Sequence, residues 1–432
     1  MNWVRASWDA VHTSLWVIPG LMFLCGAALA AGMLQLEPSW SARHLGHGWW
    51  TASGNGEDAR NLLSVLLTAV ITMASMAFSV TVVALSLAAN TYGPRLIRMF
   101  RADRGNQIVL GIFILTSVYL LLVLQSVHGE WDPAQVPQAA VSMGSILALA
   151  SVLALLAFIQ GVASSMTASE VVLRVRKELD AAINELPKLQ DNKNTSSALA
   201  EDFRKAATHI QLPSEGYVQS VEYDELVQWA SKRGVTIKLE FRPGDFVVEG
   251  DRKVLVHPCP DDPEKVRKQI EKFIVSGQHR TPTQDIEFAI RHLVEVAVRA
   301  LSPGVNDPFT AMAVIDRLRG GLARLANRQM PPEKLQDRSG ITRILRRVTT
   351  YSGAVDAALD QIRQAGSEKP AILIHLLEAI SGIVAHTQVE EQRDALARHV
   401  SLIRAAGLRD VKEPADREDL ELAYEAAMCA LG

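Results

Sequence analysis

The amino-acid sequence predicts an integral membrane protein, mainly α-helical, with four transmembrane helices followed by a cytoplasmic α+β region. Two observations lead to this fold class. Residues 1–165 contain seven Arg, seven acidic residues and no Lys, whereas the rest of the chain carries 37 basic and 40 acidic side chains. The first part also contains four long stretches without Asp, Glu, Lys or Arg. The two parts are therefore suited to two different solvents.

The uncharged stretches are long enough to cross a bilayer. They cover residues 10–36, 61–94, 105–129 and 133–169, and a helix needs about 20 apolar residues to cross a hydrocarbon core of about 30 Å. We predict helices near 15–36, 64–89, 107–127 and 140–164. A cleaved signal peptide is the alternative for the first stretch, but its apolar run is longer than a signal core, so an uncleaved helix is favoured.

The arginines predict the orientation of these helices. The linker between the second and third helices has one acidic residue, Asp103, and four arginines: Arg95, Arg98, Arg101 and Arg104. The linker between the third and fourth carries only Glu130 and Asp132. Because positive loops stay in the cytoplasm, both termini are expected there. The arginines also suit lipid headgroups or a cytoplasmic vestibule.

The second helix carries a stripe of hydroxyl side chains. At about 100° per residue, six Ser and Thr residues fall within an arc of about 80°. We call them the hydroxyl stripe: Ser64, Thr68, Thr72, Ser75, Ser79 and Ser86. Small hydroxylated residues allow close helix packing, and in an oligomer they can line a wetted path. The sequence leaves both interpretations open.

The rest of the chain is predicted to form three parts. Domain boundaries are expected at 1–165 for the transmembrane helices, 166–211 for a helical linker, 212–260 for a small β-rich module and 261–432 for a helical domain. In the module, "VTIKLEF" alternates apolar and polar residues, "RPGD" and "EGDR" are turns, and "DELVQWASKRG" is a short helix ending at Gly234.

After Pro263 the pattern is helical. We expect helices near 263–276, 283–301, 308–327, 340–365, 369–386, 388–405 and 416–430, with Gly or Pro between most of them. In the second of these, an apolar stripe is expected to be buried: Ile286, Ile290, Leu293, Ala297 and Leu301. Glu287, Arg291, Glu295 and Arg299 recur at four-residue spacing on what we interpret as a solvated or interfacial face rather than a catalytic relay.

The stretch "LSPGVNDPFT" predicts a tight corner between two helices. The first helix should stop at Ser302, because Pro303 disfavours helical geometry before it and Gly304 permits a left-handed turn. Asp307 has the side chain of an N-cap, with Pro308 at the first helical position. Asn306 is not required by such a corner, so a second interpretation is that Ser302, Gly304, Asn306 and Asp307 contact a neighbouring subunit or a small anionic ligand.

No motif of an enzyme appears. The sequence lacks a Walker loop, a dinucleotide fingerprint, HExxH and GxSxG. His375, His386 and His399 show no repeated acidic partner in the sequence, and the three cysteines form no metal pair. We therefore expect no enzymatic activity, no cofactor and no metal. Nucleic acid is not expected either, because the C-terminal part is slightly acidic and lacks a basic stripe with aromatics.

Four blocks of the sequence carry a family resemblance: "FSVTVVALSLAANTYGPRLIRMFRAD", "RPGDFVVEG", "RTPTQDIEFAIRHLVEVAVRALSPGVNDPFTA" and "ALARHVSLI". The chain resembles, over nearly its whole length, the predicted bacterial membrane proteins grouped as domain of unknown function 2254. The resemblance implies a bacterial inner-membrane location and brings no known activity.

Two functions fit these patterns. The first is an oligomeric pore-like or transport-associated protein with a cytoplasmic vestibule or gating domain. A measurement of ion flux would test this function. The alternative is a membrane-anchored cytoplasmic sensor or scaffold that binds a ligand or a partner protein. The expected partners are the lipid bilayer and further copies of the same chain; the sequence identifies no small-molecule ligand.

Overall fold

The computed structural model describes residues 17–40, 54–92, 104–133, 135–165, 168–189, 203, 206–212 and 215–432. The chain divides into two compact units, an N-terminal unit of residues 1–170 and a C-terminal unit of residues 171–432.

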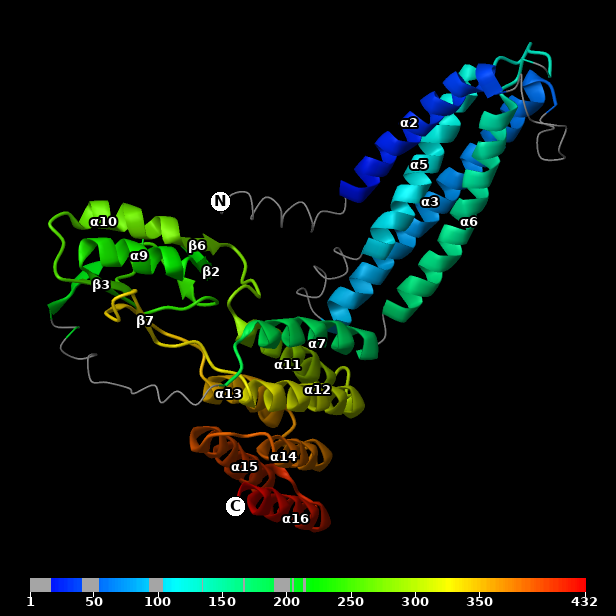
Figure 1. Ribbon diagram of the computed structural model, residues 1–432. Coiled ribbons are helices and arrows are strands. Elements are labelled where there is room, and N and C mark those ends of the chain that lie inside the picture. Colours follow the sequence, from blue (N-terminus) through cyan, green and yellow to red (C-terminus); the bar gives the residue numbers. More distant parts are fainter. Residues whose placement is uncertain are drawn as a thin grey trace. The chain divides into compact units, whose positions relative to one another are not determined.

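The N-terminal unit contains four long apolar helices (Figure 1). They are α2 (Val17–Trp40), α3 (Gly56–Tyr92), α5 (Arg104–Ser126) and α6 (Gln138–Ser165). The segments long and apolar enough to cross a membrane are Val17–Gln35, Gly56–Leu87, Gly105–Ser126 and Gln138–Ser164. Each overlaps one of the four predicted helices, which are thus confirmed as candidate membrane spans.

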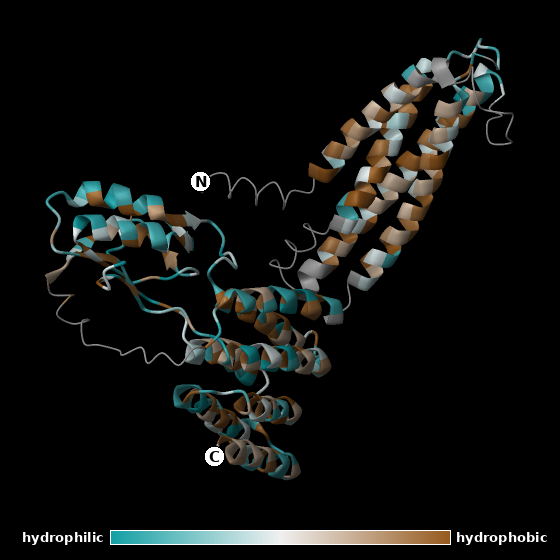
Figure 2. Cartoon of the chain, in the orientation of Figure 1, coloured by the Kyte–Doolittle hydropathy of each residue, from teal (hydrophilic) through white to brown (hydrophobic). Residues whose placement is uncertain are grey.

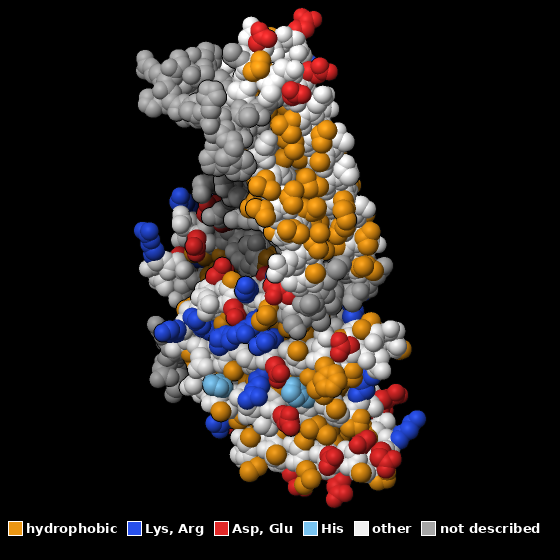
Figure 3. Space-filling model, turned by 90° about the vertical axis from the view of Figure 1, so that its right-hand side faces the viewer, with side chains coloured by type: hydrophobic (Ala, Val, Ile, Leu, Met, Phe, Trp, Pro, Cys, Tyr) orange, Lys and Arg blue, Asp and Glu red, His pale blue; other side chains and the backbone are white. Residues whose placement is uncertain are grey.

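The hydropathy of the two units differs as the sequence predicts. Hydrophobic residues follow the four long helices, whereas hydrophilic and hydrophobic residues alternate in the C-terminal unit (Figure 2). On the face drawn in Figure 3, hydrophobic side chains gather over the helices of the N-terminal unit, while Lys, Arg, Asp and Glu are spread over the other unit. An apolar outer surface of this kind is suited to lipid.

Small residues and hydroxyls bring the helices of the N-terminal unit together. At Gly26 of α2 a Cβ would lie 2.6 Å from the backbone oxygen of Leu115 in α5, so only glycine permits this approach. Between α5 and α6, Tyr119 donates a hydrogen bond of 2.8 Å from its hydroxyl to the carbonyl of Ala140. These contacts hold α5 in the bundle interior, where Phe113, Tyr119 and Leu120 are fully buried.

The C-terminal unit begins with helix α7 (Ala168–Glu185), most of which belongs to it. Val171, Val172, Val175, Leu179 and Ile183 form the buried face of this amphipathic helix. They recur at the three- and four-residue spacing of a helix that packs on one side.

Two sheets follow. The five-stranded sheet has the order β1-β5-β3-β8-β7 and the three-stranded sheet the order β4-β2-β6. The strands are β1 (Thr208–Ile210), β2 (Gly216–Val221), β3 (Thr236–Leu239), β4 (Phe246–Val247), β5 (Val254–His257), β6 (Ile274–Gly277), β7 (Lys334–Gln336) and β8 (Thr342–Arg346). Helices α9 (Tyr223–Arg233) and α10 (Pro263–Ile270) accompany them. Ile237, Leu239 and Phe241 lie in their common core with Leu226 of α9.

The sheets correct two expectations from the sequence. Strand β8 pairs in parallel with β3, from Ile237 opposite Ile344 to Leu239 opposite Arg346, whereas residues 340–365 were predicted to be one helix. Residues 274–276 were likewise predicted to be helical, but they belong to strand β6. The β-rich part is therefore completed by strands far outside residues 212–260, because long-range pairing outweighs local helical period. The helix that ends at Gly234 is confirmed, with the glycine in left-handed geometry at φ 65°.

Six helices complete the unit: α11 (Ile286–Ala300), α12 (Pro308–Ala326), α13 (Tyr351–Ala365), α14 (Pro370–Val384), α15 (Glu390–Asp410) and α16 (Pro414–Leu431). Figure 1 shows α7, α11, α12 and α13 close together, with α14, α15 and α16 on one side of them. Side-chain caps begin several helices, since Asp285, Asp307 and Thr350 each accept a backbone N–H at the start of α11, α12 and α13. The predicted buried stripe of α11 is confirmed by the burial of Ile286, Ile290, Leu293, Ala297 and Leu301.

Candidate functional site

The hydroxyl stripe lies on the surface of the N-terminal unit. All six of its residues are exposed in the single chain. The residues by which α3 packs into the bundle, Ala59, Leu63, Val70 and Ala77, are fully buried. At about 100° per residue, the centre of the stripe is about 160° from the centre of this packing face. Among the described residues, the stripe therefore takes no part in packing within one chain.

Two hydroxyls of the stripe bond to their own helix. Thr68 donates to the carbonyl of Ser64 and Thr72 donates to the carbonyl of Thr68, each at 2.8 Å. Such bonds satisfy the hydroxyl donor and leave the oxygen as an acceptor on the surface. A second hydroxyl pair lies inside the bundle, where Ser151 of α6 donates to the buried Thr116 of α5 at 3.1 Å. The sequence analysis did not single out this pair.

The arginines that follow α3 are only partly described. Arg95, Arg98 and Arg101 lie outside the described residues, and Arg104 is the first residue of α5. Their predicted roles at headgroups or in a vestibule stay predictions.

The corner between α11 and α12 has the predicted shape with one correction. Asp307 caps α12, accepting the amide of Thr310 at 3.1 Å, and Pro308 follows at the first helical position. The residue in left-handed geometry, however, is Asn306 at φ 48°, not Gly304 as predicted. Asn tolerates this geometry better than other residues with a Cβ. Asn306 is thus required by the corner, and the earlier view that the turn does not need it is wrong.

The other residues of the corner are bonded locally. Ser302 donates from its hydroxyl to the carbonyl of Arg299 at 2.6 Å, and its own carbonyl accepts the amide of Asn306 at 2.9 Å. Lys369, before α14, donates to the Asn306 side chain at 2.6 Å. The hydroxyl and the amide of Thr310 lower the pKa of the Asp307 carboxyl below its ordinary value. The corner thereby ties α11 and α12 to the start of α14.

A buried ion-pair network joins the turn after β3 to the start of α11. Arg242 Nη1 lies 2.7 Å from Oε1 of Glu287, whose side chain is 3% exposed. The same nitrogen donates to the hydroxyl of Thr349 at 2.7 Å. Arg291, one turn along α11, contributes a second contact to Glu287 at 3.3 Å. Of the two interpretations of the charge ladder on α11, a solvated or an interfacial face, Glu287 fits the interfacial one.

A second ion pair lies beside the first. Arg280 Nε approaches Asp285 Oδ2 at 2.5 Å, and this carboxylate also accepts the amide of Phe288 at 3.2 Å. Gly244 makes the approach possible, because its φ is 94° and a Cβ there would collide with the Asp285 carboxylate. Burial raises the pKa of Asp285 above its ordinary value, although the bond from Arg280 acts in the opposite direction.

Three histidines of the helical part face carboxylates on neighbouring helices. The pairs are His292 with Glu178 at 3.7 Å, His375 with Asp316 at 3.0 Å and His399 with Asp356 at 2.8 Å. The sequence shows no repeated acidic partner pattern for His375 and His399. Asp316 and Asp356 lie 59 and 43 residues away from them, so spacing along one helix could not reveal these pairs. His375 has a second partner on its own helix, Glu378, at 3.3 Å.

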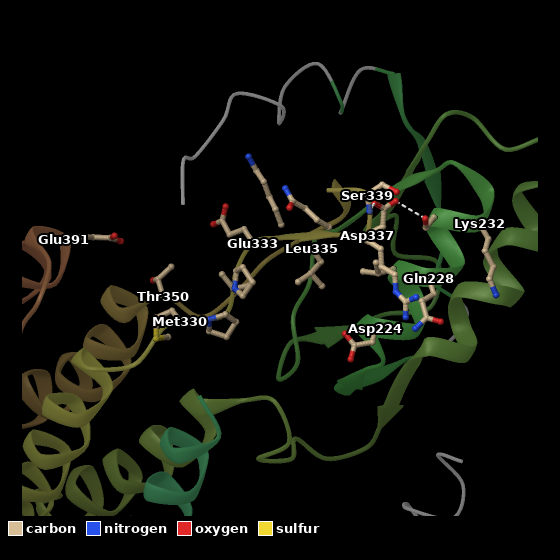
Figure 4. A pocket seen from close by; sticks show the side chains of 18 residues that line it. Asp224, Gln228, Lys232, Met330, Glu333, Leu335, Asp337, Ser339, Thr350 and Glu391 are labelled. Carbon is tan, nitrogen blue, oxygen red and sulfur yellow. Dashed lines mark hydrogen bonds between the residues drawn. The ribbon is translucent and has the colours of Figure 1, made fainter. Parts of the chain in front are cut away.

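An open groove of about 1210 Å³ lies between α9 and residues 330–339. Val227, Leu335 and Val348 give it apolar surface, and Lys232 and Glu333 add charges of both signs. At one end, Ser231 donates to Asp337 at 2.9 Å (Figure 4). Bonds from Arg343 first, then Ser231 and backbone amides, lower the pKa of Asp337 to about 2. This groove was not predicted from the sequence, because strand β7, which lines it, was not predicted.

The carboxylates in these places are held by neighbouring cations. Within the part of the chain that the structure describes, three or more His, Cys, Asp or Glu residues never gather in a way that could hold a metal ion. The charged clusters are instead bridged by arginines, as at Glu287, Asp285 and Asp337. Paired in this way, carboxylates hold structure together.

Comparisons with known proteins give the family but no activity. A family model described as "Predicted membrane protein (DUF2254)" matches residues 12–381. The chain is 28% identical to Uncharacterized protein MT1328 of Mycobacterium tuberculosis (strain CDC 1551 / Oshkosh) and to Uncharacterized protein Mb1321c of Mycobacterium bovis. Each match covers 96% of this chain and 80% of the relative. No solved structure matches the chain. The chain therefore belongs to the DUF2254 family of predicted membrane proteins.

Proposed function

We propose that the protein is a homo-oligomeric, pore-like or transport-associated protein of the bacterial inner membrane. In this proposal the hydroxyl stripes of α3 from several copies face one another around a polar path. The C-terminal unit lies in the cytoplasm and serves as a vestibule or gate. The observation that carries the proposal is the position of the stripe, which is exposed and lies opposite the face by which α3 packs into its own bundle.

The physical argument starts from the cost of polar groups in lipid. Apolar side chains are suited to a surface that contacts lipid. Helix α3 carries such side chains beside the stripe, since Met76 and Phe78 are 56% and 61% exposed. Hydroxyl oxygens gain more from water or from a neighbouring helix than from acyl chains. One stripe cannot enclose a path, so the proposal requires several copies around a closed symmetry axis.

The orientation rests on the charges of the linkers. Arg95, Arg98, Arg101 and Arg104 follow the span of α3, and the linker after α5 carries Glu130 and Asp132. The excess of positive charge favours a cytoplasmic position for the first linker and for both termini. A path lined by α3 would then open beside arginines, which favours anions at its cytoplasmic mouth.

Flux through proteoliposomes tests this function. Full-length protein is reconstituted, and the release of chloride and of potassium is followed with ion-selective electrodes. We expect release above that of empty liposomes, and lower release for Thr72→Val and Ser79→Ala. Met76→Leu, on the apolar flank of the same helix, is the matched control and should behave as the unaltered protein. Release no faster than from empty liposomes for all forms would refute a pore.

The groove in the C-terminal unit favours a second candidate, a membrane-anchored sensor or scaffold. Gln228 is exposed on its wall, and mixed charges on apolar surface suit a peptide or a polar metabolite. Native mass spectrometry of the full-length protein would reveal a bound molecule that is lost in Gln228→Trp, which places a bulky side chain in the groove. A bound molecule without ion flux would favour this candidate over the pore. If neither ion flux nor a bound molecule is detected, this candidate has no support.

A further inference from the structure

The corner between α11 and α12 exposes apolar side chains at its tip. Phe309 is 82% exposed, the largest fraction among the large hydrophobic residues that the structure describes, and Val305 is 47% exposed. Pro303 and Gly304 are also exposed. Single exposed apolar residues are common on protein surfaces, but here Pro303, Val305 and Phe309 share one tip of seven residues. We call residues 303–309 the corner tip.

The corner tip offers little charge to water. Asp307 is the only charged residue between Ser302 and Thr310. Its carboxylate is occupied by the amide and the hydroxyl of Thr310, at 3.1 and 2.5 Å. The surface that remains consists of a prolyl ring, a valine, a phenyl ring and an asparagine amide, which accepts a bond from Lys369 of the next segment. Such a surface is suited to the boundary between lipid headgroups and acyl chains.

The packing of α7 on α12 shows at which end of the helical layer the tip lies. Leu179 is the nearest neighbour of Gly321, Asp180 pairs with Arg324, and Asn184 bonds to Arg328 at 3.0 Å. Residue numbers rise together along both helices, so α7 and α12 run in parallel. The start of α7 therefore lies at the same end of the layer as the start of α12 (Figure 1). Phe309 is the second residue of α12.

The same end of the layer is tied to the membrane by the chain itself. Helix α6 spans Gln138–Ser165, and α7 begins at Ala168. Three peptide links can extend to only roughly 11 Å, so the start of α7 stays close to the end of the apolar segment at Ser164. The link therefore limits how far this end of the layer can lie from the end of the apolar segment.

We propose that the corner tip inserts Val305 and Phe309 into the adjacent lipid surface, as a second attachment of the C-terminal unit beside the covalent one through α7. The attachment uses the apolar tip and is independent of whether α3 lines a pore. The burial of two side chains gives a reversible contact. The corner is then a membrane contact and not only a turn.

Fluorescence quenching tests the proposal in the full-length protein. Cys25, Cys259 and Cys429 are replaced by Ala, and a cysteine is introduced by Phe309→Cys or Val305→Cys and labelled with the dye NBD. The protein is reconstituted into liposomes that contain phospholipids with a nitroxide on the headgroup. Both positions should show blue-shifted emission and several-fold stronger quenching than the control. The control is Ile341→Cys, which is 51% exposed beside β8.

Two results would overturn the proposal. Quenching at position 309 no stronger than at position 341 shows that the tip lies in water. Disulfide cross-linking of Phe309→Cys between two copies, with emission unaffected by the nitroxide lipid, shows that another copy covers the tip. Because Phe309 is so exposed, its replacement should not prevent folding, and an unchanged elution volume in detergent verifies this.

Discussion

Arg242 and Glu287 form a 2.7 Å ion pair that links the turn after β3 to the first turn of α11. The pair spans 45 residues of sequence, and Thr349, before α13, bonds to the same arginine nitrogen. Three segments of the C-terminal unit therefore meet at the guanidinium of Arg242. This connection fixes the β-rich part to the helical part.

Removal of the Glu287 charge should strongly destabilise the C-terminal unit. Glu287→Gln keeps the shape of the side chain but leaves Arg242 without its buried counter-ion. Loss of one member of a buried pair costs about 3–5 kcal/mol. The apparent midpoint of thermal unfolding of the full-length protein in detergent should fall clearly. Glu295→Gln is the control, because its pair with Arg299 is 25–36% exposed and worth about 0–1 kcal/mol. Equal midpoints for the two variants would show that the buried pair contributes little.

Asn306 should be replaceable by glycine but not by alanine. Its φ of 48° is left-handed, and a residue with an ordinary Cβ costs roughly 1–2 kcal/mol in that region. Asn306→Ala should therefore lower the unfolding midpoint, whereas Asn306→Gly should lower it less, although both lose the bond from Lys369. Equal losses for the two variants would attribute the role of Asn306 to its side-chain bond instead of its backbone.

Asp307 should act as a helix cap. Asp307→Ala removes the acceptor for the amide of Thr310 and should cost about 1 kcal/mol. Asp307→Asn keeps a capping oxygen and should be close to the unaltered protein in thermal unfolding. If Asp307→Ala and Asp307→Asn have the same midpoint of thermal unfolding, Asp307 contributes through its charge and not through capping.

The ionisation of Asp337 should make the stability of the fold depend on pH in the acidic range. Its pKa is lowered to about 2 from an ordinary value of 3.8, first by the bond from Arg343. A carboxyl with a lowered pKa in the folded state stabilises the fold fully above its unfolded pKa, and this stabilisation is lost as the pH falls through the folded pKa. Asp337→Asn should therefore be less stable than the unaltered protein at pH 5 to 7, and the difference should shrink between about pH 4 and 2. A difference that is constant down to pH 2 would contradict this role of the charge.

The membrane spans could be predicted because their signal is local. Twenty apolar residues in a row identify a helix in lipid whatever lies elsewhere in the chain. The α11–α12 corner was predictable for the same reason, since Asp307 and Pro308 act within one turn of helix. Gly304 was assigned the left-handed geometry because glycine adopts it at no steric cost, but the hydrogen bonds of Ser302 and Lys369 place that geometry at Asn306.

The interior of the C-terminal unit could not be predicted from local pattern. Strand β8 looks helical by itself and becomes a strand because β3 offers a parallel partner 107 residues earlier, with Ile237 opposite Ile344. The groove needs β7, and the buried pair of Arg242 and Glu287 needs the fold that joins both segments. Charged residues inside the quoted blocks "RPGD" and "RTPTQDIE" were the available signal for this network. Nothing in their spacing showed that they meet.

The accessibility of α3 to water tests the proposed pore most directly. Single cysteines replace Thr72, Ser75 and Ser79 on the stripe, or Met76 and Phe78 on its two exposed flanks, in a background without the native cysteines. The reconstituted protein is treated with a charged methanethiosulfonate, and the modified fraction is measured by mass spectrometry. A water-filled path along the stripe predicts modification at the three stripe positions and protection at both flanks. Protection at all five positions, or equal modification at the flanks, would contradict a water-filled path along the hydroxyl stripe.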